Sequence, residues 1–309
     1  MPSTRQERIR TYLRAMPPVR KVFGRRTVRR HVQGVDLYMP WSHLLPDYAR
    51  SRPTYGQNLV DLAAALADRQ QPAGEPLLVL DIGANIGDSS AQIIARTDAR
   101  VLCVEGDPYW VGYLRRNLGD DPRATIEEVL LVPDTAGDAP TVGAVRTRGT
   151  TRFVATSAHE AMPALSARAL REKHPAFDQL RLVKSDTDGF DPSLVPQVAR
   201  AWQDRGPVLF FEFDPTLARL VDDSDPNAVW AALAELGYSR LAVWDNAGDP
   251  LGQLDIEDAA DCARILEPRP IDLGYHFWDL AAARGDDAAA LAAFDELMPQ
   301  PYAPAPATR

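Results

Sequence analysis

Short apolar runs alternate with longer amphipathic segments along residues 73–298. The runs at 77–80 and 101–104 are apolar at every position, which is typical of strands buried on both faces of a parallel sheet. After each run, apolar residues recur at helical spacing, near 87–96 and 108–118. This alternation predicts an α/β fold, with helices on both faces of a mostly parallel sheet.

The same pattern continues towards residue 298. It predicts further strands at 125–132, 180–184, 208–211, 241–244 and 275–280, which completes a seven-stranded sheet. Helices are expected at 164–173, 226–236 and 286–298, with a hairpin near 152–155.

Residues 1–72 form a separate N-terminal accessory or cap region in this interpretation. A short helix at 4–15, a strand at 35–39 and a helix at 56–69 are expected there. At the other end, proline occurs four times within 299–309, which predicts a disordered tail after the domain at 73–298.

Composition narrows the class of protein. The chain has 309 residues and a net charge of −9, which is ordinary for a soluble enzyme. No apolar stretch approaches the roughly 20 residues of a membrane span, and the N-terminus has no signal-peptide pattern. Two cysteines, Cys103 and Cys262, are too few for a disulfide framework or a zinc site. We therefore expect a soluble, cytoplasmic protein with no membrane partner.

Positive charge is concentrated in residues 1–30, which contain ten Arg or Lys residues against Glu7 alone. Such an arm binds nucleic acid or a phosphorylated substrate in some proteins. A solvated helix against an acidic body explains the same charges without a partner, and we favour that interpretation. The sequence does not indicate an oligomeric state.

A glycine-containing turn joins the strand at 77–80 to the following helix. Its sequence is Asp81-Ile82-Gly83-Ala84-Asn85-Ile86-Gly87. Glycines allow the backbone to turn sharply and to approach a ligand, and a helix N-terminus presents free N–H groups to an anion. The two glycines lie four residues apart. The turn lacks the three-glycine pattern that lets the backbone lie close to the pyrophosphate of a dinucleotide.

Glu105 ends the second strand. A carboxylate at this place accepts hydrogen bonds from both hydroxyls of a ribose, and such charge-assisted bonds are stronger than neutral ones. NAD enzymes place an acid similarly, so Glu105 indicates a nucleoside ligand without choosing the cofactor.

Three motifs together resemble the FkbM family of methyltransferases that use S-adenosylmethionine (SAM). They are the turn 81–87, the segment Val104-Glu105-Gly106-Asp107-Pro108, and the segment Lys184-Ser185-Asp186-Thr187-Asp188-Gly189-Phe190-Asp191. The resemblance covers roughly residues 76–215. It implies a Rossmann-like class I methyltransferase fold and O-methylation of a sugar or another natural-product hydroxyl. The family usually has Glu where Asp188 and Asp191 stand, and residues 1–70 show no recognised signature.

The resemblance also implies roles for single residues. Those expected at the methionine part, the ribose, the adenine or elsewhere along the cofactor are Asp81, Gly83, Ala84, Asn85, Gly87, Glu105, Gly106, Asp107 and Glu128. Glu105 would hold the ribose and Glu128 would flank the adenine. Tyr55, which precedes the cofactor domain, could close over SAM.

Carboxylates follow the fourth and fifth strands, where a parallel sheet places its ligands. Asp186 is a candidate general base or an anchor for the acceptor hydroxyl, and His159 or His43 could also act as a base. Alternatively, Asp186, Glu212 and Asp214 could hold Mg²⁺ or Ca²⁺, because these ions prefer oxygen ligands. Some of these acids could instead cap helices.

The sequence therefore predicts an O-methyltransferase acting on a small hydroxylated molecule, such as a sugar or an aminosugar. Three alternatives stay open: an RNA ribose methyltransferase that uses the basic arm, an NAD-dependent oxidoreductase, and a non-catalytic SAM-binding module. The segment 186–189 lacks the Asn/Asp-Pro-Pro-aromatic motif of enzymes that methylate base amines, which argues against amine chemistry. A nucleic-acid partner is not expected, although RNA ribose methylation stays open.

Overall fold

A computed structural model represents the chain. It describes residues 24, 26–70, 74–132, 142–147, 150–155, 162–221, 225–256, 262, 266, 277–298 and 300–302, with the backbone alone for 142–147 and 150–155. Within these residues, no helix is both long and apolar enough to cross a membrane.

The core is an eight-stranded sheet in the order β13-β12-β14-β11-β10-β3-β4-β5. The strands are β3 (Leu78–Ile82), β4 (Arg100–Val104), β5 (Ala124–Glu127), β10 (Leu182–Ser185), β11 (Val208–Phe213), β12 (Tyr238–Asp245), β13 (Pro250–Asp255) and β14 (Trp278–Arg284). Strands β5 to β11 pair in parallel, whereas β14 runs antiparallel to both β11 and β12. Within this sheet, β3 comes first in the sequence, and β4 and β5 follow on one side of it. The chain then crosses over, and β10 pairs with the other side of β3. Ligands of open α/β sheets bind at such a reversal, beyond the carboxyl ends of the strands.

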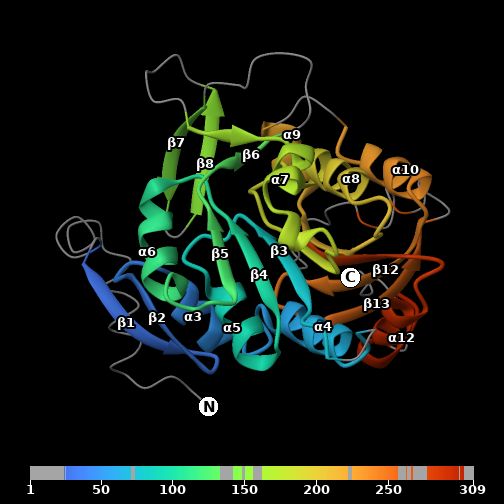
Figure 1. Cartoon of the computed structure of the whole chain (residues 1–309), viewed down its shortest axis with the longest axis horizontal. Helices are drawn as coiled ribbons and strands as arrows, with labels where there is room; N and C mark the ends of the chain where they lie inside the picture. Colours follow the sequence, from blue (N-terminus) through green and yellow to red (C-terminus); the bar gives the residue numbers. More distant parts are fainter. Residues whose placement is uncertain are drawn as a thin grey trace, which may run out of the picture.

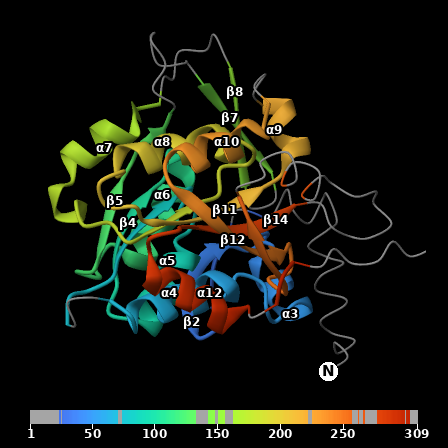
Figure 2. The same cartoon turned by 90° about the vertical axis from the view of Figure 1, so that its right-hand side faces the viewer.

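Helices cover both faces of this sheet (Figures 1 and 2). One face packs against α4 (Gln57–Ala67), α5 (Asp88–Arg96), α6 (Pro108–Leu118) and α12 (Ala288–Leu297). The other packs against α7 (Ala167–Lys173), α8 (Asp191–Ala201) and α10 (Ala228–Glu235). Helix α4 was expected in the accessory region, but its buried side chains belong to the core layer.

A hairpin and a short helix precede α4. They are β1 (Thr27–Val32), β2 (Val35–Pro40) and α3 (Leu45–Ser51). Apolar side chains of this unit pack against Ile86, Trp110 and Tyr113, so the unit rests on α6 and on the glycine turn. Figure 1 shows the hairpin beside α6 at the blue end of the chain. We call residues 26–56 the cap.

The α/β architecture predicted from the apolar pattern is confirmed, with eight strands in place of seven. Strand β13 escaped prediction because it begins with Pro250 and contains Gly252, and both residues usually interrupt strands. The expected strand at 125–132 is divided: β5 ends at Glu127, and β6 (Leu130–Leu131) pairs with β9 (Ala164–Leu165) instead.

Other expectations are met in part. The hairpin near 152–155 is present as β7 (Val142–Thr147) and β8 (Thr150–Ala155). The helix expected at 4–15 and most of the basic arm lie outside the described residues.

In the tail, Tyr302 donates its backbone N–H to the Gln253 carbonyl at 2.7 Å, so residues 300–302 are ordered against β13. Residues 299 and 303–309 lie outside the described part.

Candidate functional site

The glycine turn lies at the sheet reversal, where it connects β3 to α5. Gly83 has φ +71°, and a Cβ on it would lie 2.0 Å from the carbonyl oxygen of Asp186, which follows β10. A side chain at residue 83 is therefore excluded both by backbone conformation and by space. Asn85 also adopts a left-handed conformation, with φ 52°, which Asn tolerates better than most residues. The turn thus closes against the end of β10.

Buried polar groups fix this turn from below. Asp81 is fully buried and accepts a hydrogen bond from the Ser90 hydroxyl at 2.5 Å. Lys184 lies 3.1 Å from Asp81 and donates to the Gly83 carbonyl at 2.9 Å. Although burial alone would lower it, the pKa of Lys184 is raised by the carboxylates of Asp81 and Asp186, so the lysine stays charged. This ion pair anchors β3 to β10 directly beneath the turn.

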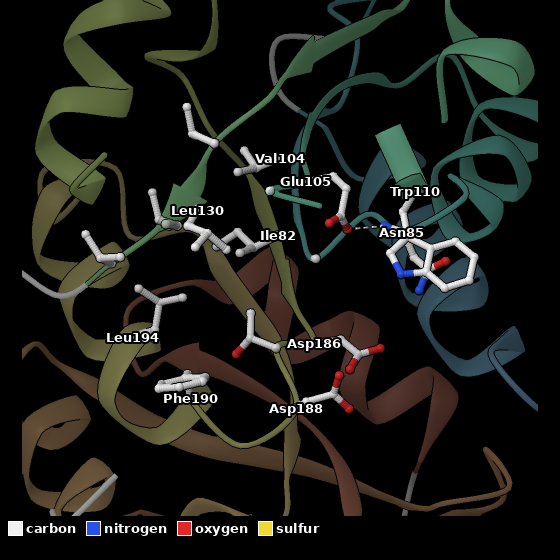
Figure 3. A pocket seen from close by; sticks show the side chains of 16 residues that line it. Ile82, Asn85, Val104, Glu105, Trp110, Leu130, Asp186, Asp188, Phe190 and Leu194 are labelled. Carbon is white, nitrogen blue, oxygen red and sulfur yellow. Dashed lines mark hydrogen bonds between the residues drawn. The ribbon is translucent and has the colours of Figure 1, made fainter. Parts of the chain in front are cut away.

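Glu105 lies beside the turn at the end of β4. Its two carboxylate oxygens accept one backbone N–H each, from Asn85 at 2.8 Å and from Asp107 at 2.7 Å. Figure 3 shows the bond to Asn85. Burial raises the pKa of Glu105 to about 7, and the two backbone hydrogen bonds oppose that rise. Because each carboxylate oxygen has more than one acceptor direction, the side chain retains capacity for the hydroxyls of a ligand.

A cavity of about 140 Å³ opens next to Glu105. Figure 3 shows its two halves: Ile82, Val104, Leu130, Phe190 and Leu194 form an apolar part, whereas Glu105, Asn85, Asp186 and Asp188 lie on the polar side. An apolar slot beside a carboxylate fits a flat ring system joined to a diol.

A second cavity of about 370 Å³ adjoins the first. Gly83, Asn85 and Asp186 line both, so the two spaces meet at the glycine turn. The residues lining the second cavity include Ala84, Ser89 and Asp88, which surround the N-terminus of α5. Backbone N–H groups at such a helix start favour an anion.

Carboxyl groups of the second cavity have raised pKa values. Burial raises the pKa of Asp88 to about 6 and that of Asp279 to about 7, and the pKa of Glu212 rises well above its ordinary value for the same reason. Asp186 adds to all three shifts by repulsion. The second cavity is therefore acidic but partly protonated near neutral pH.

The sequence prediction and the structure agree on several lining residues and differ on others. The candidates that line a cavity are Tyr55, Gly83, Ala84, Asn85, Glu105, Gly106, Asp186 and Glu212. Asp81 and Gly87 support the turn from behind; a Cβ on Gly87 would lie 2.6 Å from Leu114, so this glycine lets α5 approach α6. Asp107 accepts from the Tyr109 N–H and caps α6.

Glu128 does not lie where the prediction placed it. Because β5 ends at Glu127, the next side chain turns outward and pairs with Arg115 on the surface. The following residues, Val129 and Leu130, line the apolar half instead. His159 lies outside the described residues, and the prediction for it stays open.

The metal hypothesis gains no support from the geometry. Asp214 accepts from the Leu217 N–H at 2.8 Å and so caps α9 (Pro215–Val221), and it does not line the cavity with Asp186 and Glu212. Across the described residues, no group of three or more His, Cys, Asp or Glu side chains could hold a metal ion.

Asp279 and Gln33 were not predicted from the sequence, and His43 was named only as a possible base. All three line the second cavity. Asp279 lies within the last expected strand, at 275–280, and far from the glycine turn in sequence, so no local pattern pointed to it.

The chain matches no protein-family model and no curated protein. Among solved structures it is similar to an O-methyltransferase from Bacillus cereus in complex with SAH, at 13% identity over 78% of this chain and 89% of that one, with a TM-score of 0.39. A precorrin-6y C5,15-methyltransferase from Geobacter metallireducens shows 14% identity over 72% and 86%, with a TM-score of 0.37. An rRNA methylase from Streptococcus thermophilus shows 11% identity over 72% and 93%, with a TM-score of 0.38.

The strand order decides the fold. A parallel sheet that reverses between β3 and β10, with the antiparallel strand β14 inserted between β11 and β12, is the Rossmann-like methyltransferase fold.

Proposed function

We propose that the chain is a SAM-dependent methyltransferase that methylates a hydroxyl of a small molecule, such as a sugar, an aminosugar or another natural-product intermediate. The observation that carries the proposal is the position of Glu105. Two backbone N–H groups hold its carboxylate beside the glycine turn, in which Gly83 leaves no room for a side chain. The motif resemblance to FkbM methyltransferases supports the same assignment.

The residues present fit this cofactor. The apolar half of the first cavity suits adenine, Glu105 suits the ribose hydroxyls, and the N-terminus of α5 suits the methionine carboxylate. The sulfonium would then lie where the two cavities meet, near Gly83 and Asp186. When bound, SAM supplies an electrophilic methyl group attached to positively charged sulfur.

Asp186 is the residue proposed to act on the acceptor. It lines both cavities, and about half of its side chain is exposed, at 53%. The carboxylate of Asp186 would accept the proton of the acceptor hydroxyl while its oxygen takes the methyl group that SAM would supply. Holding the oxygen in line with the sulfonium contributes much of the rate in such a displacement.

Calorimetric titration of the full chain with SAM, and separately with NAD, tests the proposal. We expect SAM to bind and NAD not to bind, with the SAM affinity lost in Glu105→Ala. Binding of NAD alone would replace the proposal with an oxidoreductase. Binding of SAM without turnover on any alcohol would leave a non-catalytic SAM-binding protein.

A further inference from the structure

The second cavity lies between two walls from distant parts of the chain. The sheet supplies Asp186, Glu212 and Asp279, and the cap supplies Gln33, His43 and Tyr55. The cap therefore bounds the space next to the expected methyl position, and its polar groups line the same cavity as the sheet carboxylates do.

Of the three carboxyl groups of the sheet wall, only Asp186 forms an ion pair among the described residues, with Lys184 at 3.8 Å. Glu212 and Asp279 stand directly opposite each other on the antiparallel strands β11 and β14, where like charges repel. Lys184 is the one Lys or Arg among the described residues that line the cavity. It is already paired with Asp81 and with two backbone carbonyls of the turn.

This carboxyl pair lies away from the site proposed for the cofactor. Strand β11 is two strands from β3 and β14 is three, and neighbouring strands are spaced about 4.8 Å apart. The pair is therefore roughly 10 to 14 Å from the glycine turn across the sheet. A ligand group that contacts Glu212 and Asp279 is therefore more readily explained as part of a second molecule than as the methionine part of SAM.

The cap wall presents a buried donor. His43 Nδ1 accepts a hydrogen bond from the Leu45 backbone N–H at 3.2 Å, so the neutral ring carries its hydrogen on Nε2. Burial lowers the pKa of His43 to about 4, and interaction with the Asn85 side chain offsets part of that drop, so the ring is neutral at pH 7. Its Nε2 is buried and, apart from the interaction with the Asn85 side chain, has no hydrogen-bond partner among the described residues. An unpaired buried donor costs free energy unless a ligand accepts from it.

Gln33 supplies the complementary acceptor. Its amide nitrogen donates to the carbonyls of Tyr55 at 2.7 Å and Pro53 at 3.3 Å, which fixes the orientation of the amide. Its Oε1 is buried, and no partner for it lies among the described residues. One wall thus offers an N–H and a carbonyl oxygen, which matches the hydroxyl groups of a polyol.

We propose that the second cavity binds the methyl acceptor and that this acceptor is an amino sugar, whose ammonium group pairs with Glu212 and Asp279 while its hydroxyls meet His43 and Gln33. The assignment rests on the proposed methyltransferase function. It adds the charge of the substrate and four residues that recognise it.

Matched pairs of sugars test the proposal. Glucosamine against glucose, and galactosamine against galactose, are titrated into the full-length protein loaded with S-adenosylhomocysteine, with binding followed by ligand-observed NMR. We expect each amino sugar to bind at least about tenfold tighter than its neutral partner, since a charged hydrogen bond is worth more than a neutral one. Equal affinities within the pairs, or no binding by either amino sugar, overturn the proposal.

Single substitutions distinguish the contribution of the sheet wall to sugar binding from that of the cap wall. Asp279→Asn should abolish the preference for the amine while leaving S-adenosylhomocysteine affinity within about twofold. Asp255→Asn, a carboxylate on β13 that pairs with Arg240 at the surface, serves as the matched control. An unchanged preference in Asp279→Asn contradicts the proposal.

His43→Phe keeps an aromatic ring against Trp110 but removes the donor. It should weaken both members of each pair by about tenfold and leave their ratio unchanged. An unaltered affinity for both members would exclude His43 from the binding site. Failure of S-adenosylhomocysteine to load would instead refute the proposed function, and the sugar titrations of the unloaded protein would still report on the cavity.

Discussion

The side chain of Glu105 has two roles in the structure. Its carboxylate ties the glycine turn to the start of α6 through the N–H groups of Asn85 and Asp107. It also lines the first cavity, where burial raises its pKa to about 7. Hydroxyl donors from a bound ribose would favour the charged form, so binding should be accompanied by loss of a proton near neutral pH.

Replacing Glu105 by Gln tests this role. The variant keeps the shape but loses the charge, and SAM affinity should fall by about 10- to 100-fold, the range expected for hydrogen bonds to a charged group. Calorimetry measures the change. Glu128→Gln is the matched control, because Glu128 lies on the surface beside Arg115 and its replacement should leave the affinity within twofold. Equal effects of the two substitutions would contradict this site.

Gly83 leads to a prediction about stability. Gly83→Ala places a Cβ against the Asp186 carbonyl in a left-handed conformation, and the free energy of unfolding should fall by at least about 2 kcal/mol. Gly112→Ala is the control: it lies within α6, where a Cβ meets nothing within 4 Å, and should gain up to about 1 kcal/mol from helix propensity. Chemical denaturation measures both. A Gly83→Ala protein as stable as the parent would show that the turn is not closed against β10.

At the scale of elements, one side chain makes three hydrogen bonds between the cap, α6 and the glycine turn. Asn117 of α6 accepts from the Tyr38 N–H at 2.7 Å and donates to the Tyr38 carbonyl and to the Ile86 carbonyl. It therefore joins the edge of the β1–β2 hairpin to the glycine turn. Loss of this side chain would leave buried backbone groups unpaired.

We expect Asn117→Ala to lower the free energy of unfolding by about 2 kcal/mol and to increase amide exchange locally. Hydrogen exchange measured by mass spectrometry should show faster exchange in 27–40 and 83–87, with β12 unchanged. Asn246→Ala removes a single exposed bond to Arg52 and should change neither. Uniformly faster exchange across the sheet would mean that Asn117 stabilises the whole domain and not the cap.

Elements that repeat a local pattern were predictable from sequence, and those defined by distant pairing were not. The turn 81–87 and Glu105 follow directly after apolar strands, so their place at the sheet edge could be inferred. Glu128 was misplaced because the end of β5 at Glu127 depends on the pairing of Leu130 with β9. Asp279 faces Glu212 only through the antiparallel register of β14, and no sequence spacing encodes that register.

At the scale of the whole molecule, buried carboxyl groups make stability depend on pH. Burial raises the pKa of Asp88 and Asp191 to about 6 and that of Glu105 and Asp279 to about 7. These groups bind protons in the folded state that they release in the unfolded state between about pH 4 and pH 7, so they stabilise the fold most at low pH and lose this effect as pH rises. His43 acts oppositely between about pH 4 and 6.5, but it is a single group.

The unliganded protein should therefore melt at a higher temperature at pH 5 than at pH 8, by on the order of 5 °C. Differential scanning calorimetry across this range measures the trend. Glu105→Gln should flatten it, because the variant has no carboxyl at this position to ionise. A melting temperature that rises steadily from pH 5 to pH 8 would show that these carboxyl groups are not buried as described.

A crystal structure of the full chain with S-adenosylhomocysteine bound tests the central claim most directly. The account predicts the adenine against Ile82 and Leu130, both ribose hydroxyls on Glu105, and the sulfur near Gly83 and Asp186, at the junction of the two cavities. A ligand bound elsewhere, or a ribose that makes no contact with Glu105, would contradict it.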